Sequence, residues 1–280
     1  MKTIILDHDL GTNPDDFFSL LMLLNSDMVD LRLVVSGNNF PIERAVMAQK
    51  IIQQNGKEGV AVYAGEQAGH IDFNAYHLIE GVNREIGTDY KTAIKNVLDE
   101  SDAVVYLCIQ GTANISAFLK AYPEYVDTFE IIHMGMKMPG NEFMSGGTNM
   151  EADPLGAKYL YEFGLKHFKV VGAHTTINDA IRVTPETDLY KKLSVSEDEN
   201  HKMLLQHLHD YNVRRGIWPA LHDPLTSTVA LGHDFVAFEE VAVEFNDEGE
   251  YRMGGDTSML LSKGEVQNPK LFMKLCTRLV

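Results

Sequence analysis

The segment Ile5–Leu24, ILDHDLGTNPDDFFSLLMLL, joins a short apolar run to a helical pattern through a loop rich in carboxylates. The apolar residues before Asp7 predict a buried strand, and Pro14 favours the first turn of a helix over Asp15–Leu24. A strand that is apolar throughout is buried on both faces, which is typical of a parallel sheet covered by helices. This segment therefore predicts an α/β fold.

Short apolar runs alternate with helical patterns along the first two thirds of the chain. Strands are predicted at Ile4–Leu6, Leu31–Val35, Val60–Tyr63, Ala103–Ile109, Phe129–His133 and Phe168–Gly172. The last third predicts a helix, a hairpin and a final helix, at His201–Tyr211, Ala237–Tyr251 and Lys270–Leu279. This order predicts an open, mostly parallel, doubly wound sheet flanked by helices, with a small C-terminal hairpin. No linker interrupts it, so residues 1–280 are predicted to form one domain.

The charge of the chain argues against several classes of partner. The 280 residues include 40 Asp and Glu against 24 Lys and Arg, so the formal net charge is −16. Without a basic stripe to displace counterions from phosphates, nucleic-acid binding is not expected. No apolar window reaches the length of about 18 residues that a membrane span needs, and Met1–Leu6 lacks the apolar core of a signal peptide. We therefore expect no membrane partner and a cytoplasmic location. Cys108 and Cys276 lie in apolar runs and are expected to be buried and unpaired.

Polar side chains follow the predicted strands at the edge where open parallel sheets bind ligands. This edge would gather carboxylates, amides and hydroxyls, with no Lys or Arg, from Asp7, Asp9, Asp15, Asp16, Asn38, Gln110, Thr112, Asn114, Asn141, Asn149, Thr175 and Thr176. Like charges raise one another's pKa, and no basic residue lies between Lys2 and Arg32 to neutralise the first four. Oxygen ligands suit a hard cation, so the sequence predicts Ca²⁺ or Mg²⁺ there. The alternative is that Asp15 and Asp16 only favour the positive end of their helix.

A second acidic point lies late in the chain, in Leu221-His222-Asp223-Pro224-Leu225. A structural interpretation is that His-Asp-Pro marks a turn or the start of a helix. A functional interpretation is that Asp223 completes an oxygen cage and His222 offers a proton near neutral pH.

Together these motifs resemble those of the inosine-uridine nucleoside hydrolase family. That family opens with a strand, Asp-x-Asp, a Gly and a paired Asp-Asp at a helix start, as Ile5–Leu24 does with a spacer two residues longer than the commonest version. Seven later segments of this chain resemble later motifs of the family and occur in the same order. They are Ser36-Gly37-Asn38, Gln110–Ile115, Met134-Gly135, Gly140–Asn149, Asp153-Pro154, His222–Leu225 and Tyr251–Gly254. The resemblance implies hydrolysis of the N-glycosidic bond of a ribonucleoside to free base and ribose, with a tightly bound Ca²⁺. It also implies nucleoside catabolism or salvage and a homodimer or homotetramer.

The resemblance implies roles for individual residues as well. The side-chain calcium ligands match Asp9, Asp16 and Asp223. The carbonyl ligand falls at Ala113, or at Thr112 after a shift of one residue. Asp9 also matches the general base that activates a calcium-bound water, and His222 matches the residue that protonates the leaving base. Ribose contacts match Asp15, Asn38, Asn141 and Asn149, and a supporting carboxylate outside the ligand set matches Asp7. Carboxylates would stabilise the positive charge of an oxocarbenium-like transition state.

One departure from the family pattern concerns the sugar. Two residues before the Asn that matches Asn149, the family carries a Glu that contacts the sugar, and this chain has Gly147. The difference fits an altered substrate, weak activity or a shifted alignment of this loop.

Two other functions compete with nucleoside hydrolysis. A non-catalytic nucleoside or sugar sensor could share the fold, with Gly147 as the mark of lost catalysis. A haloacid-dehalogenase-like Mg²⁺ phosphatase also begins with a strand and Asp-x-Asp-x-Thr, which would make Asp7 the nucleophile. Against it, Gly11 displaces the Thr by one position, and Asp15 and Asp16 would repel a phosphate monoester.

Overall fold

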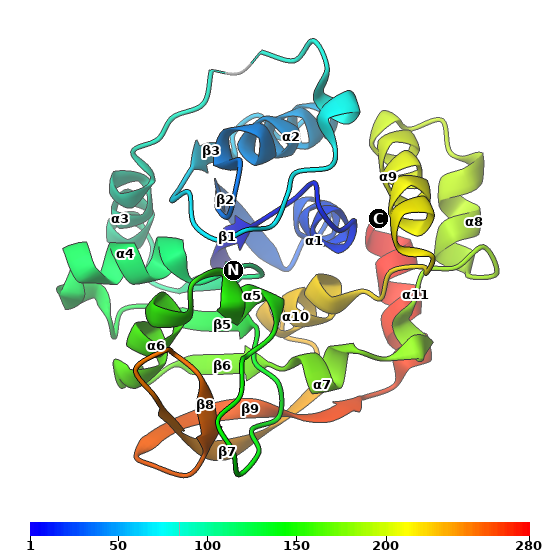
Figure 1. The fold of residues 1–280 in the computed structure, drawn as a ribbon. Coiled ribbons are helices and arrows are strands. Elements are labelled where there is room, and N and C mark those ends of the chain that lie inside the picture. The colour runs from blue at the N-terminus through cyan, green and yellow to red at the C-terminus, as the bar shows by residue number, and fades with distance from the viewer. Residues whose placement is uncertain (84) are drawn as a thin grey trace.

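The computed structural model describes residues 1–83 and 85–280, and its framework is a nine-stranded sheet with the order β3-β2-β1-β4-β5-β6-β9-β7-β8 (Figure 1). The strands are β1 Lys2–His8, β2 Val29–Ser36, β3 Ala61–Ala64, β4 Val104–Cys108, β5 Glu130–Met134, β6 Phe168–Val171, β7 Val236–Phe245, β8 Tyr251–Met253 and β9 Thr257–Val266. Neighbouring strands from β3 to β9 pair in parallel, and β7 pairs antiparallel with both β9 and β8.

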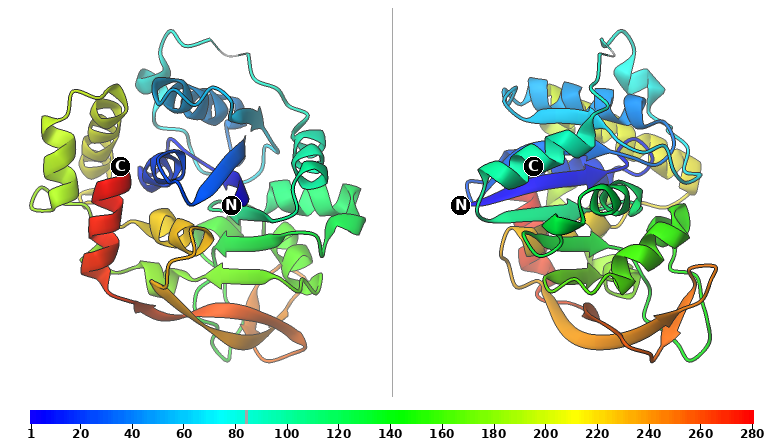
Figure 2. Two further views of the ribbon diagram at one scale, coloured as in Figure 1. Left: turned by 180° about the vertical axis from the view of Figure 1, so that it is seen from behind. Right: turned by 90° about the vertical axis from the view of Figure 1, so that its left-hand side faces the viewer.

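Helices lie on both faces of this sheet (Figure 2). The α-helices are α1 Asp15–Leu24, α2 Pro41–Gln54, α3 Tyr90–Glu100, α4 Ala113–Ala121, α5 Thr148–Ala152, α6 Pro154–Glu162, α7 Ala173–Thr176, α8 Asp188–Val195, α9 Glu199–Arg215, α10 His222–Ala230 and α11 Pro269–Leu279. Short 3₁₀ helices are η1 Tyr76–Ile79, η2 Pro123–Tyr125 and η3 Asp179–Ile181. Among the described residues, no helix is both long and apolar enough to cross a membrane.

The order of the strands reverses beside β1, and this reversal positions the functional site. The chain passes from β1 outward to β2 and β3, and then returns to place β4 on the other side of β1. In the register, Asp7 lies opposite Val35 of β2 and Cys108 of β4. Open α/β sheets bind ligands in the crevice beyond the carboxyl ends of the strands at such a reversal. The loops that follow β1, β2 and β4 therefore meet at this point.

Two apolar clusters cover the two faces of the sheet. Alternating side chains of β1 point to opposite faces, so Ile4 and Leu6 pack with α1, α2 and α10 whereas Ile5 packs with α3, α4 and α6. Cys108 and Cys276 are buried free thiols, as predicted. Asp7 follows the same alternation and points to the face of Ile5, among polar side chains of the β4–α4 turn.

The predicted order of strands and helices is confirmed, with one strand missing from the prediction. The hairpin around residues 246–249 is present as β7 and β8. It is not a separate unit, because β9, which the pattern did not reveal, lies between β6 and β7 and joins the hairpin to the parallel sheet. Apolar and polar residues alternate only partly along β9, and Lys263 and Gly264 interrupt it, so the period-2 signal of a strand is weak there.

The buried His133 connects β5 to the loop after β4, and its protonation in acid is expected to destabilise the fold. His133 of β5 lies between the Tyr161 hydroxyl, 2.9 Å from Nδ1, and the Gln110 carbonyl, 3.0 Å from Nε2. The carbonyl only accepts, so Nε2 carries the proton and Nδ1 accepts from Tyr161. Burial lowers the pKa of His133 from 6.5 to about 4. Because the folded pKa is the lower one, the stabilisation is present above pH 6.5 and is lost as the pH falls towards 4.

Substitution of this histidine isolates the effect. Between pH 7 and pH 4, the unfolding free energy of the wild type should fall by about 3 kcal/mol more than that of His133→Gln, because the glutamine can still donate to the Gln110 carbonyl but does not titrate. Urea unfolding at several pH values measures the difference, with exposed His167→Gln as the control. Parallel pH profiles for wild type and His133→Gln would contradict the argument.

Candidate active site

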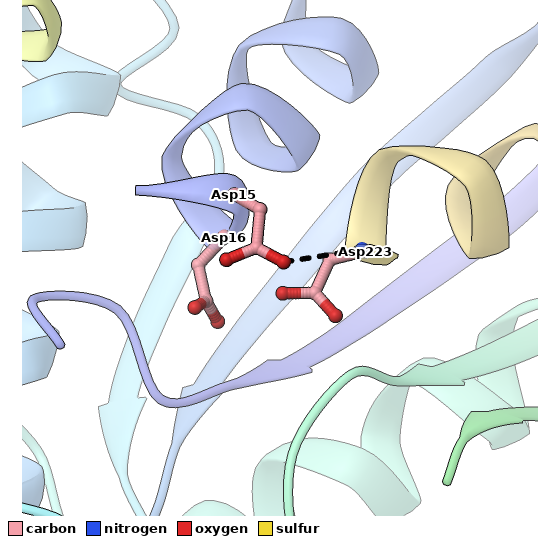
Figure 3. A group of neighbouring side chains, drawn as sticks. All are labelled: Asp15, Asp16 and Asp223. Atoms are coloured by element: carbon pink, nitrogen blue, oxygen red, sulfur yellow. Dashed lines mark hydrogen bonds between the residues drawn. The ribbon is translucent and has the colours of Figure 1, made fainter. Parts of the chain in front are cut away.

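Three carboxylates meet at the carboxyl edge of the sheet (Figure 3). Asp15 and Asp16 open α1 directly after Pro14, and Asp223 lies in the first turn of α10, which packs against α1. One carboxylate oxygen from each lies within 4.8 Å of the other two, and all three residues are buried. The Asp223 amide donates to Asp15 Oδ2 at 3.5 Å. The tertiary structure thus brings together two segments that are more than 200 residues apart in the sequence.

The electrostatics of this cluster favour a cation. Burial raises the pKa of Asp16 well above its usual value, and the nearby Asp9 and Asp15 raise it further. Burial likewise raises the pKa of Asp223, and Asp15 and Asp16 add to the effect. Like charges held together out of water resist ionisation unless a positive charge compensates them. An all-oxygen donor set of this kind suits a hard divalent ion, so the residues present fit a metal site.

Asp9 lies beside the cluster of Asp15, Asp16 and Asp223 rather than within it. Its Oδ2 accepts from Asn38 Nδ2 at 3.0 Å, and its backbone amide donates to Asp16 Oδ1 at 3.1 Å. Burial raises the pKa of Asp9, while Arg44 and Asn38 act to lower it. The structure therefore brings together all four acidic residues that the sequence assigned to metal and sugar. The ligand role of Asp9 and the ribose role of Asp15 stay predictions.

Asp7 sits behind the cluster, at the base of the β4–α4 turn. It is fully buried and accepts hydrogen bonds from the Tyr106 hydroxyl at 2.7 Å, from Asn114 Nδ2 at 2.8 Å and from Gln110 Nε2. Burial raises the pKa of Asp7 to about 7 despite these bonds. This carboxylate ties β1 to the turn that begins α4, which agrees with a supporting position. Its function stays a prediction.

Arg44 of α2 is a buried residue at the site that the sequence analysis did not single out. The prediction that no Lys or Arg reaches this edge is wrong, because the fully buried guanidinium of Arg44 donates to the backbone carbonyls of Asp9 and Leu10. A signal was available in the spacing, because Arg44, Ala48 and Ile51 recur at the interval of one helix face and an arginine on a buried face needs acceptors.

His222 begins α10 at the edge of the acidic cluster. Its Nδ1 lies 2.8 Å from Thr176 Oγ1 at the end of α7, so the loop after β6 orients the ring. Burial lowers the pKa of His222, with Asp15 acting to raise it and Arg182 to lower it. Burial raises the pKa of the Tyr211 hydroxyl on α9, and Asp15 adds to the effect. Trp218 packs edge-on against Tyr190, with 5.5 Å between the ring centroids.

The remaining predicted residues differ in how well the structure supports them. Asn149 lies at the carboxyl edge of the sheet. Its Nδ2 donates to the carbonyl of Met134, the last residue of β5, at 2.8 Å, and to the carbonyl of Ile109, which follows β4, at 3.3 Å. Asn141 does not join it: its side chain is exposed, and the flanking Gly140 and Met144 bond the backbone of edge strand β8. For the carbonyl ligand, Thr112 caps α4 and Ala113 is its first residue, and the choice between them stays a prediction.

Gly147 has a conformation that explains why no side chain stands there. Its φ is +85°, a region that L side chains rarely adopt, and a Cβ would lie 3.2 Å from Lys137 Cε. A glutamate at this position would strain the backbone and require Lys137 to move. Replacing Gly147 with glutamate would therefore disturb the backbone of this loop as well as add a side chain.

The fold and the acidic cluster define an α/β protein with three buried carboxylates that could hold a cation at the carboxyl edge of its sheet. Comparison with known families matches residues 4–275 to the model of the inosine-uridine preferring nucleoside hydrolase. The chain belongs to this family, whose members generally bind a metal, and is a nucleoside hydrolase enzyme. Membership sets aside the phosphatase alternative, and the assignment as an enzyme sets aside the non-catalytic sensor.

Solved structures of low sequence identity share the fold. A plant nucleoside hydrolase has a TM-score of 0.81 at 16% identity, with 99% of this chain and 98% of that chain covered. A purine-preferring ribonucleoside hydrolase from Gardnerella vaginalis has a TM-score of 0.81 at 20% identity, with 99% of each chain covered. An inosine-uridine preferring nucleoside hydrolase from Bacillus anthracis has a TM-score of 0.77 at 15% identity, with 100% of this chain and 99% of that chain covered. Comparison with curated proteins gave no match.

Proposed function

We propose that this chain hydrolyses the N-glycosidic bond of a ribonucleoside to free base and ribose with the aid of Ca²⁺. The observation that carries the proposal is the buried cluster of Asp15, Asp16 and Asp223 in a chain of this family. Ca²⁺ accepts six to eight oxygen ligands in flexible geometry, which suits carboxylates from separate loops. The residues that would hold it are Asp9, Asp16, Asp223 and the carbonyl of Ala113 or Thr112. When bound, the ion would act as a Lewis acid that orients water and sugar hydroxyls.

The protein's own residues would supply the proton transfers. In the proposed reaction, the oxygen of a water molecule bonds to C1′ as the bond from C1′ to the base nitrogen breaks, and the electron pair leaves with the base. Asp9 takes a proton from that water, and its bond from Asn38 holds the carboxylate in place. His222 donates a proton to the leaving base, with its ring oriented by Thr176. Asp15, Asn38 and Asn149 would bind the ribose, whereas the exposed Asn141 has the weakest support.

Removal of His222 tests its role through the leaving group. His222→Ala should slow the release of an ordinary purine or pyrimidine by about 10²–10⁴-fold, the usual contribution of a general acid. Cleavage of an activated nitrophenyl riboside should change far less, because nitrophenolate leaves without a proton. Steady-state rates on both substrates give the comparison. Equal losses on the two substrates would remove His222 from this role.

The absence at Gly147 of the glutamate that contacts the sugar in the family pattern makes the choice of substrate the first property to test. The deciding experiment measures release of reducing sugar from inosine, uridine, cytidine, adenosine and guanosine, with and without a calcium chelator. Chelator-sensitive release from any of them supports the hydrolase. Nucleosides that raise the melting temperature but are not consumed would contradict the proposed ribonucleoside hydrolysis. The same panel shows whether a purine or a pyrimidine is preferred.

The proposal also covers the domain organisation, the oligomeric state and the cellular location of the enzyme. We infer one domain over residues 1–280, supported by the single nine-stranded sheet, and a homodimer or homotetramer in the cytoplasm. Light scattering of the purified protein measures the oligomeric state directly, and a monomer would contradict that part of the proposal.

A further inference from the structure

Arg44 is buried without any exposed surface, and among the described residues its guanidinium donates only to groups of three loops at the site. Nη1 donates to the carbonyls of Asp9 and Leu10, the latter at 3.0 Å, and to Thr12 Oγ1 at 2.9 Å. These acceptors all belong to the turn after β1, which we call the Asp9–Thr12 turn. Arg44 therefore binds the backbone carbonyl of Asp9, the residue whose carboxylate is assigned to proton transfer.

The same guanidinium reaches two other loops. Nε donates to the Asn39 carbonyl at 2.7 Å, between two residues with left-handed backbone, Asn38 and Phe40. Nη2 donates to the Ile71 carbonyl at 2.8 Å, in the loop of residues 69–75. Asparagine adopts positive φ more readily than most residues, but a bulky residue such as Phe40 holds it only where its surroundings enforce it. Arg44 is therefore one of the contacts that keep Asn38 in the conformation from which its amide reaches Asp9.

The 69–75 loop closes against the Asp9–Thr12 turn around this arginine. Thr12 Oγ1 donates to the Asp72 carbonyl at 2.7 Å, and the Asn74 amide donates to the Gly11 carbonyl at 2.9 Å. The ring of Phe73 covers Gly11, where φ is +103° and a Cβ would collide with the ring. Every polar hydrogen that Arg44 uses in these bonds goes to a backbone carbonyl or to Thr12, and none goes to a carboxylate. A buried charge satisfied in this way fixes backbone geometry rather than forming an ion pair.

We propose that Arg44 is a positioning residue for catalysis, which fixes the Asp9–Thr12 turn and Asn38 against the 69–75 loop so that Asp9 and the acidic cluster are correctly placed. The inference rests on the proposed function. Charge alone predicts the opposite behaviour, because a cation near Asp9 and Asp16 repels Ca²⁺ and its removal would tighten metal binding. Two substitutions, Arg44→Met and Arg44→Lys, can therefore separate the effect of the hydrogen bonds of Arg44 from the effect of its charge.

The experiment compares Arg44→Met, Arg44→Lys and the control Lys50→Met by terbium luminescence titration with Ca²⁺ competition, and by kcat and KM on the best nucleoside. Lys50 is a matched control, since it lies on the same helix and donates to a carbonyl, that of Leu78, outside these loops. Both Arg44 variants should bind Tb³⁺ at least 10-fold more weakly and lose at least 100-fold in kcat, and Lys50→Met should stay within twofold of wild type. Full rescue by lysine, or tighter metal binding in Arg44→Met, would overturn the proposal.

A readout that needs neither metal nor turnover separates this inference from the proposed function. Hydrogen exchange followed by mass spectrometry should show faster exchange in peptides covering residues 9–14 and 69–75 of Arg44→Lys, with no change in Lys50→Met. If Arg44→Met does not fold, Thr12→Val removes one acceptor while Arg44 stays, and should increase exchange in the same peptides. Unchanged exchange in Arg44→Lys and Thr12→Val would refute the positioning role even in an active enzyme. Altered exchange in a protein that cleaves no nucleoside would support it and contradict only the hydrolase proposal.

Discussion

Asp9→Asn is expected to lower kcat for nucleoside hydrolysis by about 10²–10⁴-fold while leaving the fold intact. Asparagine has the shape of aspartate and can accept the bond that Asn38 Nδ2 makes to Asp9 Oδ2 at 3.0 Å. It cannot take a proton from water. Because burial already disfavours the charged form of Asp9, the neutral side chain should not reduce the melting temperature of the metal-free protein.

The measurement is steady-state hydrolysis of the preferred nucleoside together with terbium titration of the same preparation. Titration separates lost proton transfer from lost metal, since Asp9 is also assigned as a ligand. Asp30→Asn, a half-buried acid on β2 outside the site, is the control for loss of one negative charge. Activity of Asp9→Asn near that of wild type would remove Asp9 from the role of general base.

Asp223→Asn is expected to stabilise the metal-free protein and to abolish the stabilisation that Ca²⁺ gives. Burial and the neighbouring Asp15 and Asp16 all disfavour ionised Asp223, so a neutral side chain relieves repulsion when no cation is present. A gain of about 1 kcal/mol would raise the melting temperature by about 2 °C in a chain of this size. In the wild type, Ca²⁺ at 100 times its Kd should add about 2.7 kcal/mol, whereas the variant should gain almost none.

Thermal unfolding of both proteins, in chelator and in excess Ca²⁺, measures these opposite shifts. Asp234→Asn, an exposed acid in the loop after α10, should behave like the wild type. A variant that is less stable than wild type in chelator, or one still stabilised fully by Ca²⁺, would show that Asp223 does not belong to a cation site.

The acidic half of the site could be predicted because its residues lie next to strand ends. Asp7 and Asp9 lie at and beyond the end of a strand whose central residues, Ile4–Leu6, are all apolar, and parallel strands gather such residues at one edge. The position of Asp223 depended on the resemblance, since the tripeptide His-Asp-Pro alone also fits a turn. Its distance to α1 comes from the packing of α10 against that helix.

Other features could not be predicted because they depend on contacts between distant segments. Arg44 reaches Asp9 only through the side-by-side placement of β1 and β2, and an arginine in a helical pattern is usually solvated. Asn141 matched a motif but lies beside β8, since the loop after β5 extends to the edge of the sheet before α5 begins. β9 escaped detection because its burial comes from its neighbours rather than from a regular alternation of its own residues.

The sequence by itself determined the α/β architecture, the order of its first six strands and the acidic character of the site, because apolar periodicity and strand-end positions are local properties. Only the tertiary structure decided that β9 joins the hairpin to the main sheet, that Asp15, Asp16 and Asp223 lie within reach of one ion, and that Arg44 holds three loops together. These features arise from contacts between segments far apart in the chain. Their geometry is set by packing, which no local pattern encodes.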